Sequence, residues 1–127
     1  MRRFRHLAVA VTAVAFVLAS PAYAHPKLLS SSPAANSAAA APSKLSLAFN
    51  EKLMPQLSGM DVVMTGMPGM PDQRMNVTGF QTAVTEDGKT LVATFPKPLT
   101  AGAYQVKWHA VSIDTHRVEG QFVFSVP

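Results

Sequence analysis

The chain has 127 residues, no cysteine, and a formal net charge of +4 from 11 basic and 7 acidic side chains. This length suits one small domain, and the lack of cysteine excludes disulfides and thiolate metal sites. Arg2, Arg3 and Arg5 lie within the first 24 residues, so eight basic and seven acidic residues remain beyond them and the net charge there is +1. That balance leaves no basic patch or stripe of the kind that binds nucleic acid.

The first 24 residues have the pattern of a secretory signal peptide. The basic start is followed by an apolar stretch from Leu7 to Ala19 and by the small-residue box Ala22-Tyr23-Ala24. The apolar stretch is shorter than the ~20 residues that span a bilayer, and no later segment approaches that length. We therefore expect cleavage after residue 24, giving an exported single domain at residues 25–127 that does not itself span a membrane.

Cleavage there would make His25 the first residue of the mature chain. A terminal histidine offers its α-amine and its imidazole Nδ1 to one metal ion. Their pKa values of ~7.7–8.0 and ~6.5 make deprotonation easy near neutral pH, and imidazole suits Cu, Zn, Ni and Fe. Pro26 has no N–H and so supplies no deprotonated amide as a further ligand. The remaining ligands must come from elsewhere in the fold.

Apolar and polar residues alternate along much of the mature chain, with the period of two that is typical of half-buried strands. A Ser-, Ala- and Pro-rich segment at residues 30–42 and the Asp87-Gly88 turn interrupt the alternation, and no window has a helical period. Six or seven short strands predict an all-β fold, a small Greek-key sandwich or barrel. The expected strands lie near residues 27–29, 45–50, 60–65, 91–95, 102–110 and 118–126. The expected core contains Phe49, Phe95, Tyr104, Trp108, Phe122 and Phe124.

Every methionine except Met1 lies between Met54 and Met75. Pro68 and Gly69 interrupt this window, so part of it must be a loop rather than a helix or a central strand. Thioethers are soft ligands that favour Cu(I) and need no deprotonation. We interpret Met60 as a core residue and leave the role of Met54 open. The four expected Cu(I) ligands are Met64, Met67, Met70 and Met75; an adaptable protein-binding surface is the alternative.

A second candidate motif, Asp114-Thr115-His116, lies between the last two expected strands. In an extended segment, Asp114 and His116 point to the same side. A D-x-H motif alone is typical of a turn aspartate beside a surface histidine. With His25, however, it completes a set of three nitrogens and one oxygen, which suits Cu(II). His109 alternates with Trp108 and is expected to be a solvated strand residue, with a ligand role left open.

Together these motifs resemble the CopC family of periplasmic copper-resistance proteins. The resemblance implies a cupredoxin-like or immunoglobulin-like β fold with separate Cu(II) and Cu(I) sites. It implies His25, Asp114 and His116 as Cu(II) ligands and the four methionines as Cu(I) ligands. Some family members have a histidine between the last two methionines, and this chain has none. The matching segments are residues 25–28, 64–70, 98–104, Trp108 and 112–116.

The resemblance further implies a periplasmic copper carrier, without enzymatic activity, that exchanges copper with an inner-membrane transporter of the CopD type. A histidine-brace copper monooxygenase is an alternative, but Asp114 would fill the coordination position that oxygen activation needs open. A metal-free, methionine-rich interaction module is the third interpretation, and it predicts a protein that carries no copper.

Overall fold

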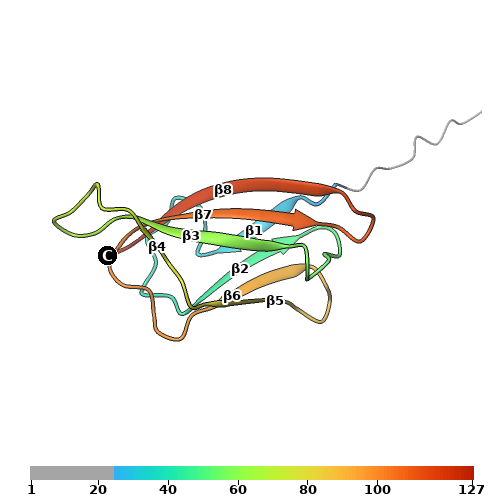
Figure 1. The fold of residues 1–127 in the computed structure, drawn as a ribbon, viewed down its shortest axis with the longest axis horizontal. Helices are drawn as coiled ribbons and strands as arrows, with labels where there is room; N and C mark the ends of the chain where they lie inside the picture. Colours follow the sequence, from blue (N-terminus) through green and yellow to red (C-terminus); the bar gives the residue numbers. More distant parts are fainter. Residues whose placement is uncertain (1–24) are drawn as a thin grey trace, which may run out of the picture.

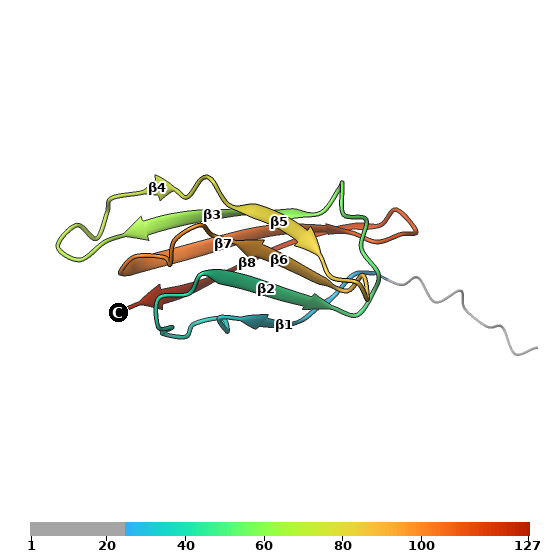
Figure 2. The same cartoon turned by 90° about the horizontal axis from the view of Figure 1, so that it is seen from below.

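The structure, a computed structural model, describes residues 25–127, so the predicted signal peptide lies outside the described residues. The described chain forms eight strands in two four-stranded sheets that pack face to face (Figures 1 and 2). The strands are β1 (Leu28–Ser32), β2 (Lys44–Phe49), β3 (Gly59–Gly66), β4 (Met75–Asn76), β5 (Gln81–Val84), β6 (Thr90–Thr94), β7 (Gly102–Val111) and β8 (Arg117–Val126).

The chain crosses between the two sheets after every second strand. One sheet has the order β1-β2-β6-β5 and the other β4-β3-β7-β8, and neighbouring strands in both are antiparallel. The predicted all-β fold is therefore confirmed as an open sandwich, not a closed barrel. Among residues 25–127, no helix is long and apolar enough to cross a membrane.

Two of the eight strands, β4 and β5, were not among the expected ones. β4 has two residues and pairs only with Val63 and Met64 of β3. β5 lies at the edge of its sheet, and most of its side chains are exposed. Alternation in a sequence reports a strand with one buried face, and neither edge strand has one. β1 also runs on to Ser32, beyond the expected end at residue 29.

The inner faces of the two sheets form one continuous core. Tyr104 stacks on Phe124 with ring centroids 5.3 Å apart, and Phe49 meets Trp108 edge-on at 5.2 Å. Both arrangements are favourable for aromatic pairs. All six aromatic residues expected in the core are buried: Phe49, Phe95, Tyr104, Trp108, Phe122 and Phe124.

The long hairpin of β7 and β8 places the two candidate sites at opposite ends of the sandwich. At one end a short turn joins β7 to β8, beside the segment that leads into β1 (Figure 1). At the other end β3 runs into the methionine loop, beside the start of β7. Ten residues of β7 at about 3.3 Å each separate the ends by about 30 Å. We call them the histidine end and the methionine end.

Candidate metal centres

Between β7 and β8, Ser112 pairs with His116 and encloses a three-residue loop at residues 113–115. The Ser112 N–H donates to the carbonyl of His116 at 2.9 Å, and the Thr115 N–H donates to the carbonyl of Ser112 at 2.8 Å. Thr115 has a φ of 74°, the left-handed conformation that usually ends such a loop. A β-branched residue rarely adopts this conformation. The turn holds residues 114 and 116 close together despite that strain.

Both oxygens of the Asp114 carboxylate are engaged within this turn. Oδ2 lies 3.0 Å from Nδ1 of His116. Oδ1 accepts a short hydrogen bond from the hydroxyl of Ser112 and a longer one, 3.4 Å, from the His116 N–H. The Ser112 hydroxyl is the main reason that the pKa of Asp114 falls to about 2, with His116 the next cause. Asp114 is therefore an anion at any physiological pH.

His25 lies beside this turn, in the segment that leads into β1 of the other sheet. Its ring centroid is 4.9 Å from that of His116, and the rings lie edge to face at 68°. The segment that carries His25 is tied down two residues later, because the Lys27 N–H donates to Oδ1 of Asn50 at 2.7 Å. Pro26, between them, is buried. The fold thus brings together the three residues predicted to bind Cu(II).

The three side chains are close but do not yet form a complete ligand set. Among residues 25–127, no group of three His, Cys, Asp or Glu side chains is arranged to hold a metal ion. Asp114 and His116 have suitable spacing, since two ligands about 2.0–2.2 Å from one ion at a right angle lie roughly 3 Å apart. The predicted α-amine ligand of His25 does not exist while residues 24 and 25 are joined.

The methionine loop begins with a tight hairpin. Met67 and Met70 exchange two backbone hydrogen bonds of 3.0 and 2.9 Å across Pro68 and Gly69. Gly69 has a φ of 78°, the value that the third position of a type II turn requires, and proline is common at the position before it. At Gly66 the loop folds back so closely that an added Cβ would lie 2.6 Å from the carbonyl oxygen of Pro71. Backbone hydrogen bonds and this close approach therefore constrain the shape of the loop.

The four predicted Cu(I) ligands form two cross-strand pairs. Met64 of β3 is directly opposite Met75 of β4, and Met67 is opposite Met70 in the hairpin. Met64 is buried and Met67 is partly buried against the core, whereas Met70 and Met75 are 54% and 50% exposed. A hollow of about 350 Å³ beside the hairpin is lined by Met67, Pro68 and the C-terminal residues. The backbone thus pairs the four residues two by two and exposes Met70 and Met75.

The remaining candidates lie elsewhere. Met60 is buried in the core, as predicted. Met54 is partly buried near the histidine end, where its N–H donates to the carbonyl of Val111 at 2.7 Å. His109 lies over Gly59 on the outer face of its sheet and is only partly exposed.

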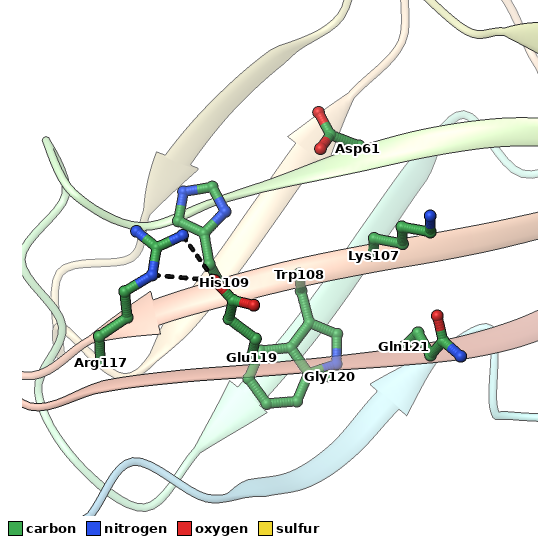
Figure 3. Close-up of a pocket in the computed structure, with 8 residues that line it drawn as sticks. All are labelled: Asp61, Lys107, Trp108, His109, Arg117, Glu119, Gly120 and Gln121. Carbon is green, nitrogen blue, oxygen red and sulfur yellow. Dashed lines mark hydrogen bonds and ion pairs between the residues drawn. The ribbon is translucent and has the colours of Figure 1, made fainter.

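His109 lines a polar hollow of about 390 Å³ with Lys107 and the Arg117–Glu119 ion pair, whose closest N–O distance is 2.8 Å (Figure 3). His109 is thus on the outer face, in a different polar cluster from that of the histidine end.

Sequence reasoning missed two residues that support the histidine end. Ser112 lies two residues before Asp114, a spacing that allows a hydroxyl to bind a turn carboxylate, and this signal was available. Asn50 carries no such signal, because its partner Lys27 is distant in the sequence. Only the pairing of β1 with β2 brings them together.

Comparison with known proteins is consistent across sequence and structure. The CopC domain family matches residues 28–127. Copper resistance protein C of Xanthomonas campestris pv. juglandis is 48% identical over 127 residues, 99% of each chain. That of Pseudomonas syringae pv. tomato is 48% identical over 120 residues, 93% of each chain.

Solved structures give the same result. The crystal structure of PcoC, a methionine-rich copper resistance protein from Escherichia coli, superimposes with a TM-score of 0.73 at 44% identity, covering 82% of this chain and 100% of PcoC. CopC from Methylosinus trichosporium OB3b superimposes with a TM-score of 0.64 at 28% identity, covering 80% of this chain and 93% of that one.

Proposed function

The chain belongs to the CopC family, and from that premise we propose that it is a periplasmic copper carrier that serves copper resistance. It would bind Cu(II) at the histidine end and Cu(I) at the methionine end, with copper as its cargo. The observation that carries the proposal is the contact of His25 with His116, whose ring centroids lie 4.9 Å apart although the two residues are distant in the sequence.

The Cu(II) ligands would be the α-amine and imidazole of His25 with the side chains of Asp114 and His116. Three nitrogens and one carboxylate oxygen suit the tetragonal preference of Cu(II). The Asp114 carboxylate is an anion at neutral pH, and the hydrogen bonds that lower its pKa to about 2 keep it ionised in mild acid as well. Cleavage after residue 24 would supply the missing amine. Signal-peptide removal would therefore also activate the site.

The Cu(I) ligands would be the thioethers of Met64, Met67, Met70 and Met75. Thioethers prefer Cu(I) and carry no proton to displace. The exposed Met70 and Met75 would make first contact with the ion, and the less exposed Met64 and Met67 would complete the site from the core side. With no histidine between residues 70 and 75, the site would depend on sulfur alone.

The separation of about 30 Å between the ends means that one ion cannot be shared by both. The oxidation state of copper would then decide which end is loaded. At the histidine end, 37% of the His116 side chain and 44% of the Asp114 side chain are exposed, so a partner could reach both for ligand exchange. We propose an inner-membrane copper transporter of the CopD type as that partner.

The test uses protein exported by cells and shown by intact mass to begin at His25. Cu(II) and Cu(I) affinities are measured by competition with chelators for the wild type, H116A and H109A. We expect H116A to lose most Cu(II) affinity and keep Cu(I) affinity. H109A, which removes an imidazole from the outer face, should retain both. Unchanged Cu(II) binding in H116A would contradict the assignment.

A further inference from the structure

Each half of the histidine end rests on a polar contact made by a residue outside the expected ligand set. We propose that Ser112 and Asn50 are positioning residues for Cu(II): Ser112 holds Asp114 against His116, and Asn50 holds the segment that presents His25. This inference rests on the proposed Cu(II) site and concerns how the fold prepares that site before the metal arrives.

Ser112 is the fixed point of the β7–β8 turn. Only 1% of it is exposed, and it is one of two polar residues buried in the described part of the chain. Its backbone N–H and carbonyl close the turn through His116 and Thr115. A buried hydroxyl requires a hydrogen-bond partner, and here the main partner is Oδ1 of Asp114. The buried Ser112 hydroxyl thus restricts the rotation of the Asp114 carboxylate, which is partly exposed to solvent.

The position of Asp114 in turn restricts His116. While Oδ1 is held by Ser112, Oδ2 lies 3.0 Å from Nδ1 of the His116 ring. The two oxygens of one carboxylate therefore link a buried hydroxyl to an imidazole, and fixing the first restricts the second. Ser112 is thus an outer partner of a ligating carboxylate, and removal of such partners costs about 10- to 100-fold in metal affinity.

Asn50 restrains the segment that carries His25. Its side-chain Oδ1 accepts from the Lys27 N–H at 2.7 Å, and its own N–H donates to the Lys27 carbonyl at 3.2 Å. Lys27 is two residues from His25, and the intervening Pro26 is buried and has a fixed φ. The connection from the Asn50 contact to the backbone of His25 is therefore only two residues long, and one of its dihedral angles is fixed by the Pro26 ring.

The chain contains a matched control turn between β5 and β6. There the Thr85 hydroxyl donates to Oδ1 of Asp87 at 2.5 Å, and the Lys89 N–H donates to the same oxygen at 3.0 Å. The spacing of hydroxyl and carboxylate is the same as in Ser112 and Asp114, but no histidine follows within the turn. T85A thus removes an equivalent hydrogen bond without touching the candidate site.

The experiment measures Cu(II) affinity, the EPR spectrum of the Cu(II) protein and Cu(I) affinity in processed protein beginning at His25. S112A and N50A should each weaken Cu(II) binding by about 10- to 100-fold and change the EPR parameters. S112T, which keeps a hydroxyl, should restore binding toward the wild type. T85A should leave Cu(II) binding unchanged, and all four variants should keep wild-type Cu(I) affinity.

A readout on the metal-free protein separates positioning from copper chemistry. The ¹⁵N shifts of the His116 ring should change in S112A and stay as in the wild type in T85A. Wild-type Cu(II) affinity and EPR parameters in both S112A and N50A would overturn the proposal. If S112A does not fold, N50A decides, because Asn50 is exposed and its side chain makes one bond.

H116A distinguishes this inference from the proposed function. If H116A loses Cu(II) while S112A and N50A bind as the wild type does, the site stands and the positioning roles fail. If H116A binds Cu(II) normally, the proposed site fails, and the positioning inference fails with it.

Discussion

The two ends of the sandwich are prepared for copper in different ways. At the histidine end, side-chain hydrogen bonds hold the candidate ligands, as in the chain from Ser112 through Asp114 to His116. At the methionine end, the backbone does this work, through the hairpin of Met67 and Met70 and the close approach of Pro71 to Gly66. Charged and imidazole ligands can be oriented by hydrogen bonds, whereas a thioether is only a weak acceptor. Soft ligands must therefore be placed by the loop that carries them.

The largest effect should come from blocking the terminal amine. Protein with one extra alanine before His25 would keep every side chain of the histidine end and lose the amine–imidazole chelate. We expect Cu(II) affinity to fall by more than the roughly 10- to 100-fold that outer partners contribute. Cu(I) affinity should stay the same. Chelator competition on the extended and processed proteins measures both, and equal Cu(II) affinities would remove the amine from the site.

The double variant M70L and M75L removes two expected Cu(I) ligands at the methionine end. Both side chains are about half exposed, so the double variant should fold with little loss of stability. It should bind Cu(I) much more weakly and bind Cu(II) as the wild type does. M60L is the control, because Met60 is buried in the core and its replacement by leucine conserves volume at a cost below about 1.5 kcal/mol. Wild-type Cu(I) affinity in the double variant would indicate that these thioethers are not ligands.

A subtler change tests whether backbone shape matters at the methionine end. In G66A, the new Cβ would lie 2.6 Å from the carbonyl oxygen of Pro71, so the loop must move. We expect weaker Cu(I) binding with all four methionines still present, and unchanged Cu(II) binding. Competition assays on G66A check this. A loop that binds Cu(I) equally well after this shift would not depend on the backbone geometry described above.

The smallest effect concerns acid stability. The hydroxyl of Ser112, followed by His116, lowers the pKa of Asp114 from 3.8 to about 2. A carboxyl whose pKa is lower in the folded state stabilises the fold above pH ~4, and this contribution disappears as the pH falls through about 2. The difference in Tm between wild type and D114N should therefore shrink from pH 5 to pH 2. The M70L and M75L double variant should show no such pH-dependent difference, and a constant gap for D114N would contradict the hydrogen-bonded pair.

Strands with one buried face could be predicted from the sequence. The alternation of Tyr104, Val106 and Trp108 marked β7 and its share of the core. The edge strands β4 and β5 were not predicted, because a strand without a buried face shows no alternation of apolar and polar residues. Which methionines are buried could not be predicted either. Met64 and Met75 are the same residue type, and only the sheet places Met64 in the core and Met75 on an edge strand.

The candidate ligands could be predicted from residue chemistry, but of the two contacts that hold them only that of Ser112 with Asp114 leaves a signal in the local sequence. His25, Asp114 and His116 are recognisable from their donor atoms and positions in the sequence. The contact of Asn50 with Lys27 depends on the register of β1 and β2. That register is a product of the tertiary fold, which a short sequence motif does not encode.

The most direct test of the two-ended account is an NMR titration of the processed, ¹⁵N-labelled protein with each oxidation state of copper. Cu(II) should broaden signals around residues 25–27, 50 and 112–117 and leave the methionine loop sharp. Cu(I), added under reducing conditions, should shift signals in residues 64–75 and the methyl groups of the four methionines, with no change at the histidine end. Perturbation of the same end by both ions would contradict the account.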